Sequence, residues 1–365
     1  MRVLFANWDY EAFLEDFQER NPDLSGRSYA EQLETRRNSS FGMADFYSRN
    51  LARLGHECED IFVNNLSLQR RWALENGIRI PADPFRVVPY LRRFIRPWFM
   101  RIVLEQVRKW RPDLLYVMCM GHFDPALLRE IRPHVRLIAG QHASPPPRFA
   151  DLSEYDIILS SLPNLVRFFR GKGRKAEYLR LGFEESLLDG IRGIERTIPI
   201  SFVGGLGDNH RPFVKLLEYL CQHTEVAVWG YGIETLPARS PLRTCYRGRA
   251  FGKEMFRILG ASKIAVNRHI PAAEQYANNM RLYEATGCGA LLLTDRKENL
   301  HELFDVGKEV VAYGDGEECL QQARYYLEKE EERETLAAAG QERTLRDHTY
   351  RQRVGELIDI LRPLL

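Results

Sequence analysis

Short apolar runs rich in valine, isoleucine and leucine alternate with amphipathic stretches along the chain. In the first half, these runs predict strands at Val3–Ala6, Asp60–Val63, Leu114–Cys119, Leu137–Ala139, Ile157–Ser160 and Tyr178–Leu181. Helical spacing of apolar residues predicts helices at Gly42–Leu54, Pro97–Trp110, Pro125–Ile131 and Pro163–Arg170. Near-continuous apolar strands separated by helices indicate a parallel sheet covered on both faces. The stretch Trp8–Ser40 is polar and weakly periodic, so we expect a long functional or mobile connection there.

The same alternation restarts after a polar stretch near residues 185–197. Its predicted strands are Ile200–Val203, Val226–Trp229, Ile264–Val266, Ala290–Leu293 and Val310–Ala312. Its predicted helices are Pro212–His223, Lys253–Leu259, Met280–Thr286, Leu300–Phe304 and Cys319–Glu330. After a break at Ala337–Gly340, a last helix is expected at about Thr349–Leu361. The pattern therefore predicts an α/β protein with domains at 1–186 and 187–345, and a C-terminal helix, 346–365, that packs back on the first domain.

Composition and charge narrow the class of protein further. The chain has 365 residues, of which 44% are hydrophobic and 28% charged, as in a globular protein with a sizeable core. The 52 lysines and arginines nearly balance 50 acidic residues, so the whole molecule is not a general polyanion binder. The six cysteines form no CxxC pair, which favours reduced, mostly buried thiols. Because the first apolar run is too short for a signal peptide and no run is long enough to span a membrane, we expect a cytoplasmic protein.

A glycine-rich turn follows the first strand of the second half. The strand leads into Gly204, Gly205 and Gly207, and a helix is expected to begin near Pro212. Glycines allow close approach of the backbone, and the helix N-terminus offers free N–H groups to a phosphate. The dinucleotide-binding pattern GxGxxG is not met, because its last position is His210. An ordinary tight turn remains the alternative.

A second candidate lies on the helix predicted at Met280–Thr286. Arg281 and Glu284 are three residues apart and therefore share one helical face. A carboxylate suits a ribose diol, and an arginine suits a phosphate. The alternative is a surface ion pair between the two side chains, which would contribute little energy.

This second segment resembles a known family. The run Asn279–Tyr313, which contains RLYEATGCGALLLTD and HELFDVGKEVVAY, resembles the CgeB-like, group 1 glycosyltransferases. FVGG at 202–205, WGYG at 229–232 and YRG at 246–248 fit the same donor-binding half in order. YLRLGFE at 178–184 resembles the strand that ends the first domain of these enzymes.

The resemblance covers about residues 178–330 and implies the GT-B fold. In that fold, two Rossmann-like domains face each other across a cleft; the C-terminal one binds a nucleotide-sugar and the N-terminal one largely binds the acceptor. The implied function is metal-independent glycosyl transfer in glycan biosynthesis, from a nucleotide-sugar co-substrate to a hydroxyl group of a glycan, lipid-linked or small-molecule acceptor, without a cofactor. Two alternatives stay open: a nucleotide-sugar epimerase of the same fold, and a non-catalytic protein that binds sugar or nucleotide.

The resemblance also assigns donor-binding residues. Glu284 matches the carboxylate that holds the donor ribose. Related retaining enzymes have a second glutamate eight residues before this one, but here that position is Tyr276. The stereochemical outcome of the transfer therefore stays open. Arg211 and Lys215 match the basic pair that steadies the diphosphate leaving group, which would make a metal unnecessary. The further candidates are Arg268 for the diphosphate, and Tyr246 and Arg247 beside the base.

The general base is expected from the first domain. His122 and Asp124 follow one predicted strand, and His142 follows the next. At the carboxyl end of a parallel strand, such a group can accept the proton of an acceptor hydroxyl. The alternatives are a loop histidine at either position, and a helix cap for Asp124, which precedes Pro125.

Local charge departs most from the global balance at residues 70–111. This segment has eleven basic and three acidic residues, a net charge of +8, with aromatic residues interleaved. Such a mixture suits the interface of an anionic membrane or an anionic acceptor. A helix with buried aromatics and a solvated basic face is the alternative. We expect no nucleic-acid partner, because no recognised binding module accompanies the segment.

Overall fold

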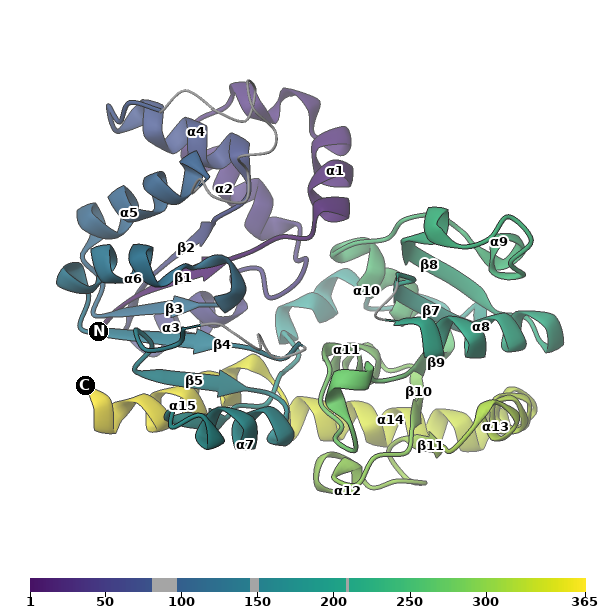
Figure 1. Ribbon diagram of the computed structural model, residues 1–365. Coiled ribbons are helices and arrows are strands. Elements are labelled where there is room, and N and C mark those ends of the chain that lie inside the picture. Colours follow the sequence, from purple (N-terminus) through teal and green to yellow (C-terminus); the bar gives the residue numbers. More distant parts are fainter. Residues whose placement is uncertain (81–96, 145–150, 208–209) are drawn as a thin grey trace. The chain divides into compact units, whose positions relative to one another are not determined.

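The computed structural model describes residues 1–80, 97–144, 151–207 and 210–365, which divide into two compact units (Figure 1). Unit 1 comprises Met1–Ser160, Leu165–Tyr178 and Leu357–Leu365. Unit 2 comprises Ser161–Asn164 and Leu179–Glu356. The main crossing of the chain thus follows Tyr178, ahead of the boundary predicted at residue 186.

Unit 1 is built on a six-stranded parallel sheet with the strand order β2-β1-β3-β4-β5-β6. The strands are β1 (Arg2–Asn7), β2 (Glu57–Phe62), β3 (Leu114–Val117), β4 (Leu137–Gln141), β5 (Ile157–Ser160) and β6 (Ala176–Tyr178). The order reverses between β1 and β3, because the chain adds β2 on one side of β1 and β3 on the other. In open parallel sheets, ligands bind beyond the carboxyl ends of the strands at such a reversal.

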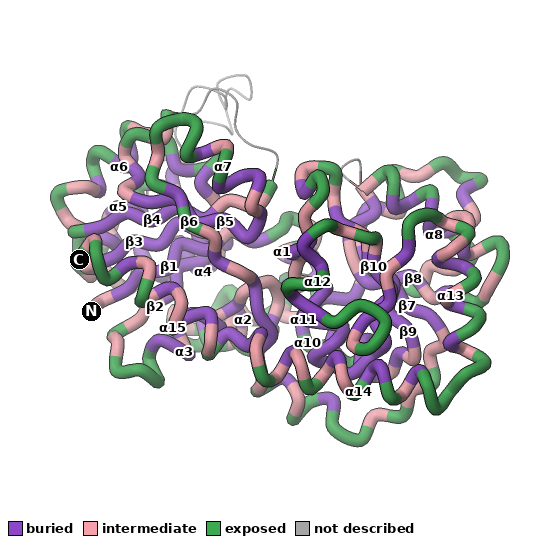
Figure 2. The backbone as a smooth tube through the Cα atoms, turned by 90° about the horizontal axis from the view of Figure 1, so that it is seen from below, coloured by how far each residue is buried: buried purple, intermediate pink, exposed green. Residues whose placement is uncertain are grey.

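Helices cover both faces of this sheet. Figure 2 shows α5, α6 and α7 on one side of the strands, and α3 and the end of α15 on the other. The helices of unit 1 are α1 (Glu11–Arg20), α2 (Tyr29–Asn38), α3 (Phe46–Arg53), α4 (Leu66–Glu75), α5 (Trp98–Trp110), α6 (Pro125–Ile131) and α7 (Pro163–Gly171). The predicted return of the C-terminus to the first domain is confirmed: Leu357–Leu365 belongs to unit 1, and the Leu365 carbonyl accepts a hydrogen bond from Arg136 Nη2 at 2.5 Å.

Unit 2 contains a five-stranded parallel sheet with the order β11-β10-β9-β7-β8. The strands are β7 (Ile198–Gly205), β8 (Ala227–Tyr231), β9 (Ser262–Asn267), β10 (Leu291–Asp295) and β11 (Val311–Tyr313). Its helices are α8 (Arg211–His223), α9 (Leu242–Cys245), α10 (Lys253–Gly260), α11 (Met280–Gly287), α12 (Leu300–Leu303), α13 (Gly316–Glu328), α14 (Glu330–Asp347) and α15 (Tyr350–Leu361). Here the order reverses between β7 and β9, next to the glycine-rich turn. Both units are therefore Rossmann-like, as predicted.

Two expectations about local structure are wrong. The stretch Trp8–Ser40 is not one long connection, because it forms α1, a short 3-10 helix, η1 (Pro22–Gly26), and α2. A capping box between Ser28 and Glu31 begins α2. The buried face of α2 includes Gln32 and Arg36, so an apolar pattern does not reveal it.

The predicted break at Ala337–Gly340 is also wrong, because α14 continues through it and ends at Asp347. At Gly340, a Cβ atom would lie 2.3 Å from the Glu309 carbonyl oxygen. The glycine therefore allows a close approach of the helix to neighbouring backbone instead of ending it.

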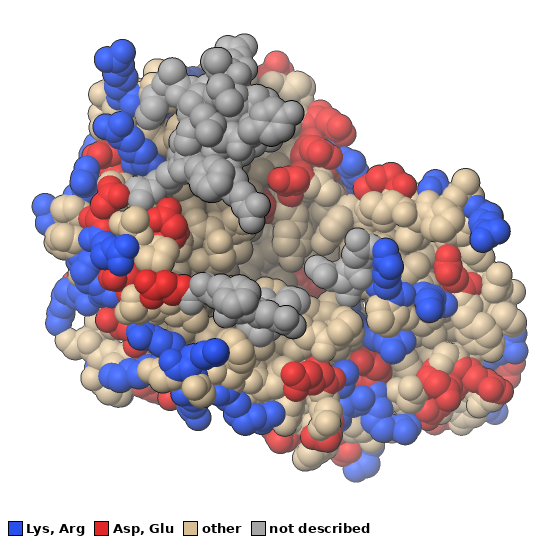
Figure 3. Space-filling view, viewed as in Figure 1, with Lys and Arg blue, Asp and Glu red and all other residues tan. Residues whose placement is uncertain are grey.

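Among the described residues, no helix is long and apolar enough to cross a membrane. In the face shown in Figure 3, lysine and arginine side chains are interspersed with acidic ones, in keeping with the small net charge. Of the basic segment 70–111, residues 81–96 lie outside the described residues, and with them four of its arginines: Arg86, Arg92, Arg93 and Arg96.

Candidate active site

The turns after β7 and β8 in unit 2 lie against each other through glycines. The Leu206 N–H donates to the Tyr231 carbonyl at 2.9 Å. Gly230 has a φ of +137°, and a Cβ there would meet the Gly204 carbonyl oxygen at 1.8 Å, so only glycine fits. A Cβ on Gly205 would lie 2.9 Å from the Tyr231 hydroxyl. The chain thus keeps bare backbone at the reversal point of the sheet, which is the arrangement a phosphate site needs.

The predicted diphosphate-binding cations lie around the beginning of α8. Arg211 and Lys215 are exposed and one turn apart on this helix. Arg268, which directly follows β9, donates from Nη1 to the Pro212 carbonyl at 3.3 Å. The structure therefore brings Arg268 to the first turn of α8. Gly207 also lies close to this turn, because its carbonyl accepts from the His210 N–H at 2.8 Å; Asp208 and Asn209 are outside the described residues.

Arg281 and Glu284 form an ion pair inside unit 2 and not on its surface. Arg281 Nη1 lies 3.0 Å from Glu284 Oε2, and the two side chains are 14% and 7% exposed. Arg281 Nη2 donates to the Val203 carbonyl at 2.7 Å, which ties α11 to β7. Burial raises the pKa of Glu284, and the charge of Arg281 opposes this shift. Arg281 is thus committed to protein partners, whereas Glu284 Oε1 makes no hydrogen bond with any described residue.

Tyr246 and Arg247 flank the β8 turn. The Tyr246 hydroxyl donates to the Gly230 carbonyl at 2.7 Å, and the Arg247 N–H donates to the Val228 carbonyl at 2.8 Å. Burial raises the pKa of Tyr246. These bonds hold the segment beside the glycine turns, where the exposed Arg247 side chain reaches solvent.

The sequence prediction missed a histidine–aspartate pair between neighbouring strand ends of unit 2. His269 Nδ1 donates to Asp295 Oδ1 at 2.7 Å, and His269 Nε2 accepts from the Asn278 N–H at 3.2 Å. Burial acts to raise the pKa of Asp295, but the hydrogen bonds from His269 together with the nearby charge of Lys297 outweigh it and lower the pKa. The pair fixes the loop between β9 and α11, in which Glu274 adopts a φ of +50°. Because β9 and β10 are adjacent, the shared strand edge was the signal that sequence reasoning did not use.

In unit 1, His122 lies at the reversal point between β1 and β3. Its imidazole stacks on the Trp8 ring with centroids 3.5 Å apart and planes inclined by 4°. Trp8 directly follows β1, and His122 ends a short 3-10 helix, η4 (Met120–His122), after β3. Desolvation beside the Trp8 ring lowers the pKa of His122, which favours the neutral form of the imidazole.

The other two candidates of unit 1 have structural partners. Asp124 accepts the Leu127 N–H at 2.8 Å and caps α6, as the helix-cap alternative predicts. His142 follows β4 directly, with its Nε2 3.3 Å from the Ser144 hydroxyl and its ring edge-on to Phe169. Both histidines are at carboxyl ends of neighbouring strands, and both remain candidates for the base.

A second missed feature of unit 1 is a buried ion pair beside the same strand ends. Arg36 Nε and Nη2 donate to the Asp9 carboxylate at 2.9 and 2.5 Å, with side-chain exposures of only 2% and 3%. The guanidinium also bonds the Ser39 hydroxyl and the Phe41 carbonyl. These bonds hold a strained turn, because the non-glycine residues Ser40 and Ala44 have φ of +57° and +40°.

Known proteins provide an independent comparison. Residues 210–359 match a family model described as glycosyl transferase-like. No curated protein sequence matches the chain significantly. A glycosyltransferase involved in avilamycin A biosynthesis has a similar structure, with a TM-score of 0.60, 14% identity, and coverage of 100% of this chain and 98% of the other. HepE from Anabaena, in a complex with UDP and glucose, aligns over 100% of both chains with a TM-score of 0.58 and 12% identity. Sucrose-phosphate synthase from Thermosynechococcus elongatus gives 0.59 and 12%, over 100% of this chain and 98% of the other.

The whole chain therefore has the GT-B fold of these structures, and its residues 210–359 match the glycosyl transferase-like family model. The resemblance to group 1 glycosyltransferases predicted from the sequence is thereby confirmed. The matched region contains α8, which follows the glycine-rich turn, and also Arg281 and Glu284. The finer CgeB-like subdivision stays a prediction.

Proposed function

We propose that the protein transfers a sugar from a nucleoside diphosphate sugar, held by unit 2, to a hydroxyl group of an acceptor bound by unit 1. The observation that carries the proposal is Glu284, a buried carboxylate one of whose oxygens is held by Arg281 while the other has no partner among the described residues. It lies in the unit that also carries the glycine turns and α8. A carboxylate oxygen so placed can accept a ribose hydroxyl.

Exposed cations at the start of α8 support a leaving-group role for that region. When the glycosidic bond to the diphosphate breaks, negative charge develops on the leaving phosphate oxygen. Arg211, Lys215 and Arg268, together with the positive N-terminal end of α8, would stabilise that charge without a metal ion. HepE binds UDP and glucose, which makes a UDP-sugar the first donor to test.

On the acceptor side, a neutral imidazole takes the proton of the attacking hydroxyl. His122 is the better placed of the two histidines, since it lies at the reversal of the sheet, is held by Trp8, and has a pKa lowered by burial. The acceptor is a glycan, a lipid-linked glycan or a small hydroxyl compound. The epimerase and non-catalytic alternatives are not favoured, since the family match is to transferases.

Thermal-shift measurements against a panel of nucleotides and nucleotide-sugars test the proposal directly. A ligand that binds the native state alone raises its unfolding temperature. We expect stabilisation by a nucleoside diphosphate and its sugar, and loss of that stabilisation in Glu284→Gln. The absence of stabilisation by every nucleotide tested would overturn the donor assignment.

A further inference from the structure

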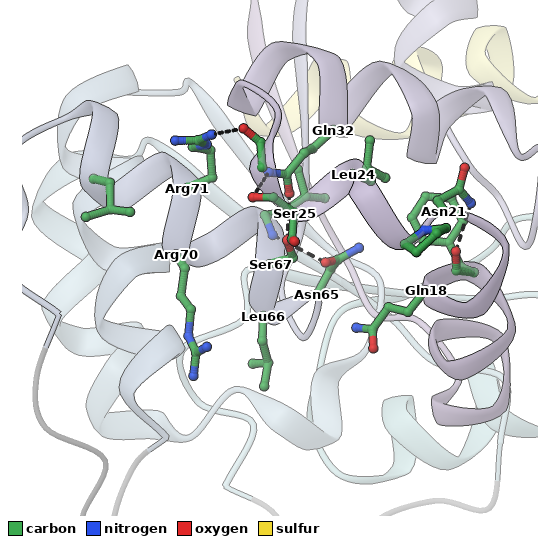
Figure 4. Close-up of a pocket in the computed structure, with 15 residues that line it drawn as sticks. Gln18, Asn21, Leu24, Ser25, Gln32, Asn65, Leu66, Ser67, Arg70 and Arg71 are labelled. Carbon is green, nitrogen blue, oxygen red and sulfur yellow. Dashed lines mark hydrogen bonds between the residues drawn. The ribbon is translucent and has the colours of Figure 1, made fainter.

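Unit 1 contains a cavity of about 770 Å³ that the proposed chemistry does not use. It lies among α1, η1, α2 and the beginning of α4, beyond the carboxyl end of β2 (Figure 4). Its volume is in the range of small-ligand sites. The residues around it come from 17–32 and from 65–74, so the two helices missed by sequence reasoning form much of its wall.

The polar lining is rich in side-chain amides, and none of the described residues that line the cavity is acidic. Gln18, Asn21, Gln32 and Asn65 contribute amides, and Ser25 and Ser67 contribute hydroxyls. Some of these groups hold the wall together: the Ser67 hydroxyl donates to Gln32 Oε1 at 2.8 Å, and Gln32 Nε2 donates to the Arg27 carbonyl at 3.0 Å. Two arginines, Arg70 and Arg71, give the lining a positive charge. Amides and hydroxyls recognise ligand hydroxyl groups, and the missing carboxylates favour an anion.

Asn65 is a buried side chain with a donor available to the cavity. It is only 4% exposed, and its Oδ1 accepts the Leu68 N–H at 3.3 Å as the cap of α4. Its Nδ2 finds no acceptor among the described residues. Figure 4 shows Nδ2 turned away from α4, toward the side of Gln18 and Asn21.

The beginning of α4 adds positive potential at the same place. Leu66 and Ser67 are the first two residues of α4, both line the cavity, and their N–H groups have no partner within the described part of the chain. Arg70 lies one turn further on the same helical face and makes no ion pair with any described residue; its guanidinium lies 5.5 Å above the Trp98 ring. Arg71, in contrast, is occupied by the Gly26 and Arg27 carbonyls. Arg70 is thus the cation left for a ligand.

We infer that this cavity binds an anionic saccharide, with its hydroxyl groups on the amides and its phosphate or carboxylate group at the beginning of α4 beside Arg70. Leu66 and Phe17 supply apolar surface for the sugar ring. The saccharide would be the charged part of the acceptor, a role that rests on the proposed function. The binding of an anionic saccharide to this cavity does not depend on that function.

Calorimetric titration of the full chain tests the inference with four probes: a hexose 6-phosphate, a hexuronate, inorganic phosphate and a neutral hexose. We expect a charged sugar to bind more tightly than the neutral hexose and than inorganic phosphate, and added salt to weaken that binding. The comparison of hexose phosphate with hexuronate distinguishes the two sources of the anionic group. Equal binding of neutral hexose, or no binding of either charged sugar, overturns the inference.

Two variants and a control assign the binding to this cavity. Arg70→Gln removes the cation, and Asn65→Asp keeps a good helix cap while placing a carboxylate where the anion would lie. Each should weaken binding about tenfold or more, the effect of losing a charged hydrogen bond. The control is Arg101→Gln, an exposed arginine of α5 that does not line the cavity; it should bind like the wild type. Unchanged binding in both test variants overturns the inference.

UDP titration of the same samples keeps the two proposals separate. Loss of UDP binding with intact saccharide binding would contradict the proposed donor site alone. In a transfer assay, the saccharide is an acceptor part if Arg70→Gln raises the acceptor KM while the donor KM is unchanged.

Discussion

Replacement of Glu284 by glutamine tests the role of the buried carboxylate in unit 2. The change keeps the shape of the side chain and removes its charge. Glu284 Oε2 is 3.0 Å from Arg281 Nη1, and at an effective dielectric constant near 20 the attraction across that distance is about 5 kcal/mol before the cost of desolvation. Removing one partner of a buried pair typically costs about 3–5 kcal/mol. Burial raises the pKa of Glu284 despite the charge of Arg281, so the ion pair does not repay the full cost of burying the carboxylate. Because glutamine also still offers Arg281 a carbonyl oxygen, we expect the unfolding free energy at neutral pH to fall by no more than about 1–2 kcal/mol.

The loss of nucleotide affinity is a separate quantity. If Glu284 Oε1 accepts a ribose hydroxyl, the variant loses a charged hydrogen bond, about 1–3 kcal/mol or roughly a 5- to 150-fold rise in Kd. Calorimetric titration with UDP measures this below the melting temperature, and urea unfolding measures the stability. The matched control is Glu330→Gln, which removes the acid of an i,i+3 pair of the same unit at a carboxylate that is 70% exposed. It should change the stability by less than about 1 kcal/mol and leave the UDP affinity unchanged.

The pH dependence gives a further check on the same residue. The pKa of Glu284 in the folded protein is raised above 4.5, so the folded state takes up this proton before the unfolded state does. The stability of the wild type relative to Glu284→Gln should therefore increase as the pH falls from the raised pKa towards about 4.5. A folded Glu284→Gln protein that binds UDP as tightly as the wild type would refute the ribose assignment.

Three further predictions follow from other parts of the molecule. His122→Ala or His142→Ala should lower turnover about 100-fold in a transfer assay while the UDP affinity stays unchanged. If both variants retain full turnover, Asp124 becomes the next candidate for the base. Replacement of Asp124 should also lower the unfolding free energy by about 1 kcal/mol, because its side chain caps α6. Burial lowers the pKa of His348 from 6.5 to about 4. As the pH falls from 6.5 to 4, the unfolded state therefore binds a proton that the folded state does not bind, and the unfolding free energy should fall by about 3 kcal/mol. Urea unfolding measures this loss, which should be absent in His348→Gln. If the basic segment 70–111 contacts membranes, co-sedimentation with vesicles should require anionic lipid, decrease with added salt, and weaken when Arg92, Arg93 and Arg96 are replaced by glutamine. The absence of binding at low salt would leave only an anionic partner other than a membrane.

Most inner strands of both sheets were predictable because their burial is nearly complete. The edge strands β2, β6 and β8 also contain half-buried or exposed positions, and the predicted strand Tyr178–Leu181 overlaps β6 only at Tyr178. Strands such as β3 and β10 consist almost wholly of buried apolar residues, which makes them visible in the sequence as unbroken runs. Helices with polar residues on their buried face are not visible in this way. In α2 the buried positions include Arg36 and Gln32, whose partners, Asp9 and Ser67, lie far away in the sequence. The cavity bounded by α2 was therefore also beyond the sequence prediction.

The candidate site was predictable in position but not in the direction of its side chains. Glycine turns at strand ends and the helix of Glu284 could be located from spacing alone, since the carboxyl ends of parallel strands share one edge. That His122 stacks on Trp8 depends on the adjacency of β1 and β3, which the chain order of the strands does not reveal. The direction of Arg281 depends on a carbonyl of β7 that has no sequence pattern at all.

The partners of the arginine side chains distinguish two roles that the sequence alone does not distinguish: pairing with a buried carboxylate and binding a phosphate. Arg36 and Arg281 each neutralise a buried carboxylate and bind a backbone carbonyl, of Phe41 and Val203 respectively, near the end of a strand. An arginine with both kinds of partner would have to give them up to bind a phosphate, at the cost of an unpaired buried acid. Lys215 and Arg268 carry no such cost, since no buried carboxylate pairs with either of them in the described ion pairs. We therefore propose that Lys215 and Arg268, with Arg211 beside them, bind the diphosphate, and that Arg281 positions Glu284.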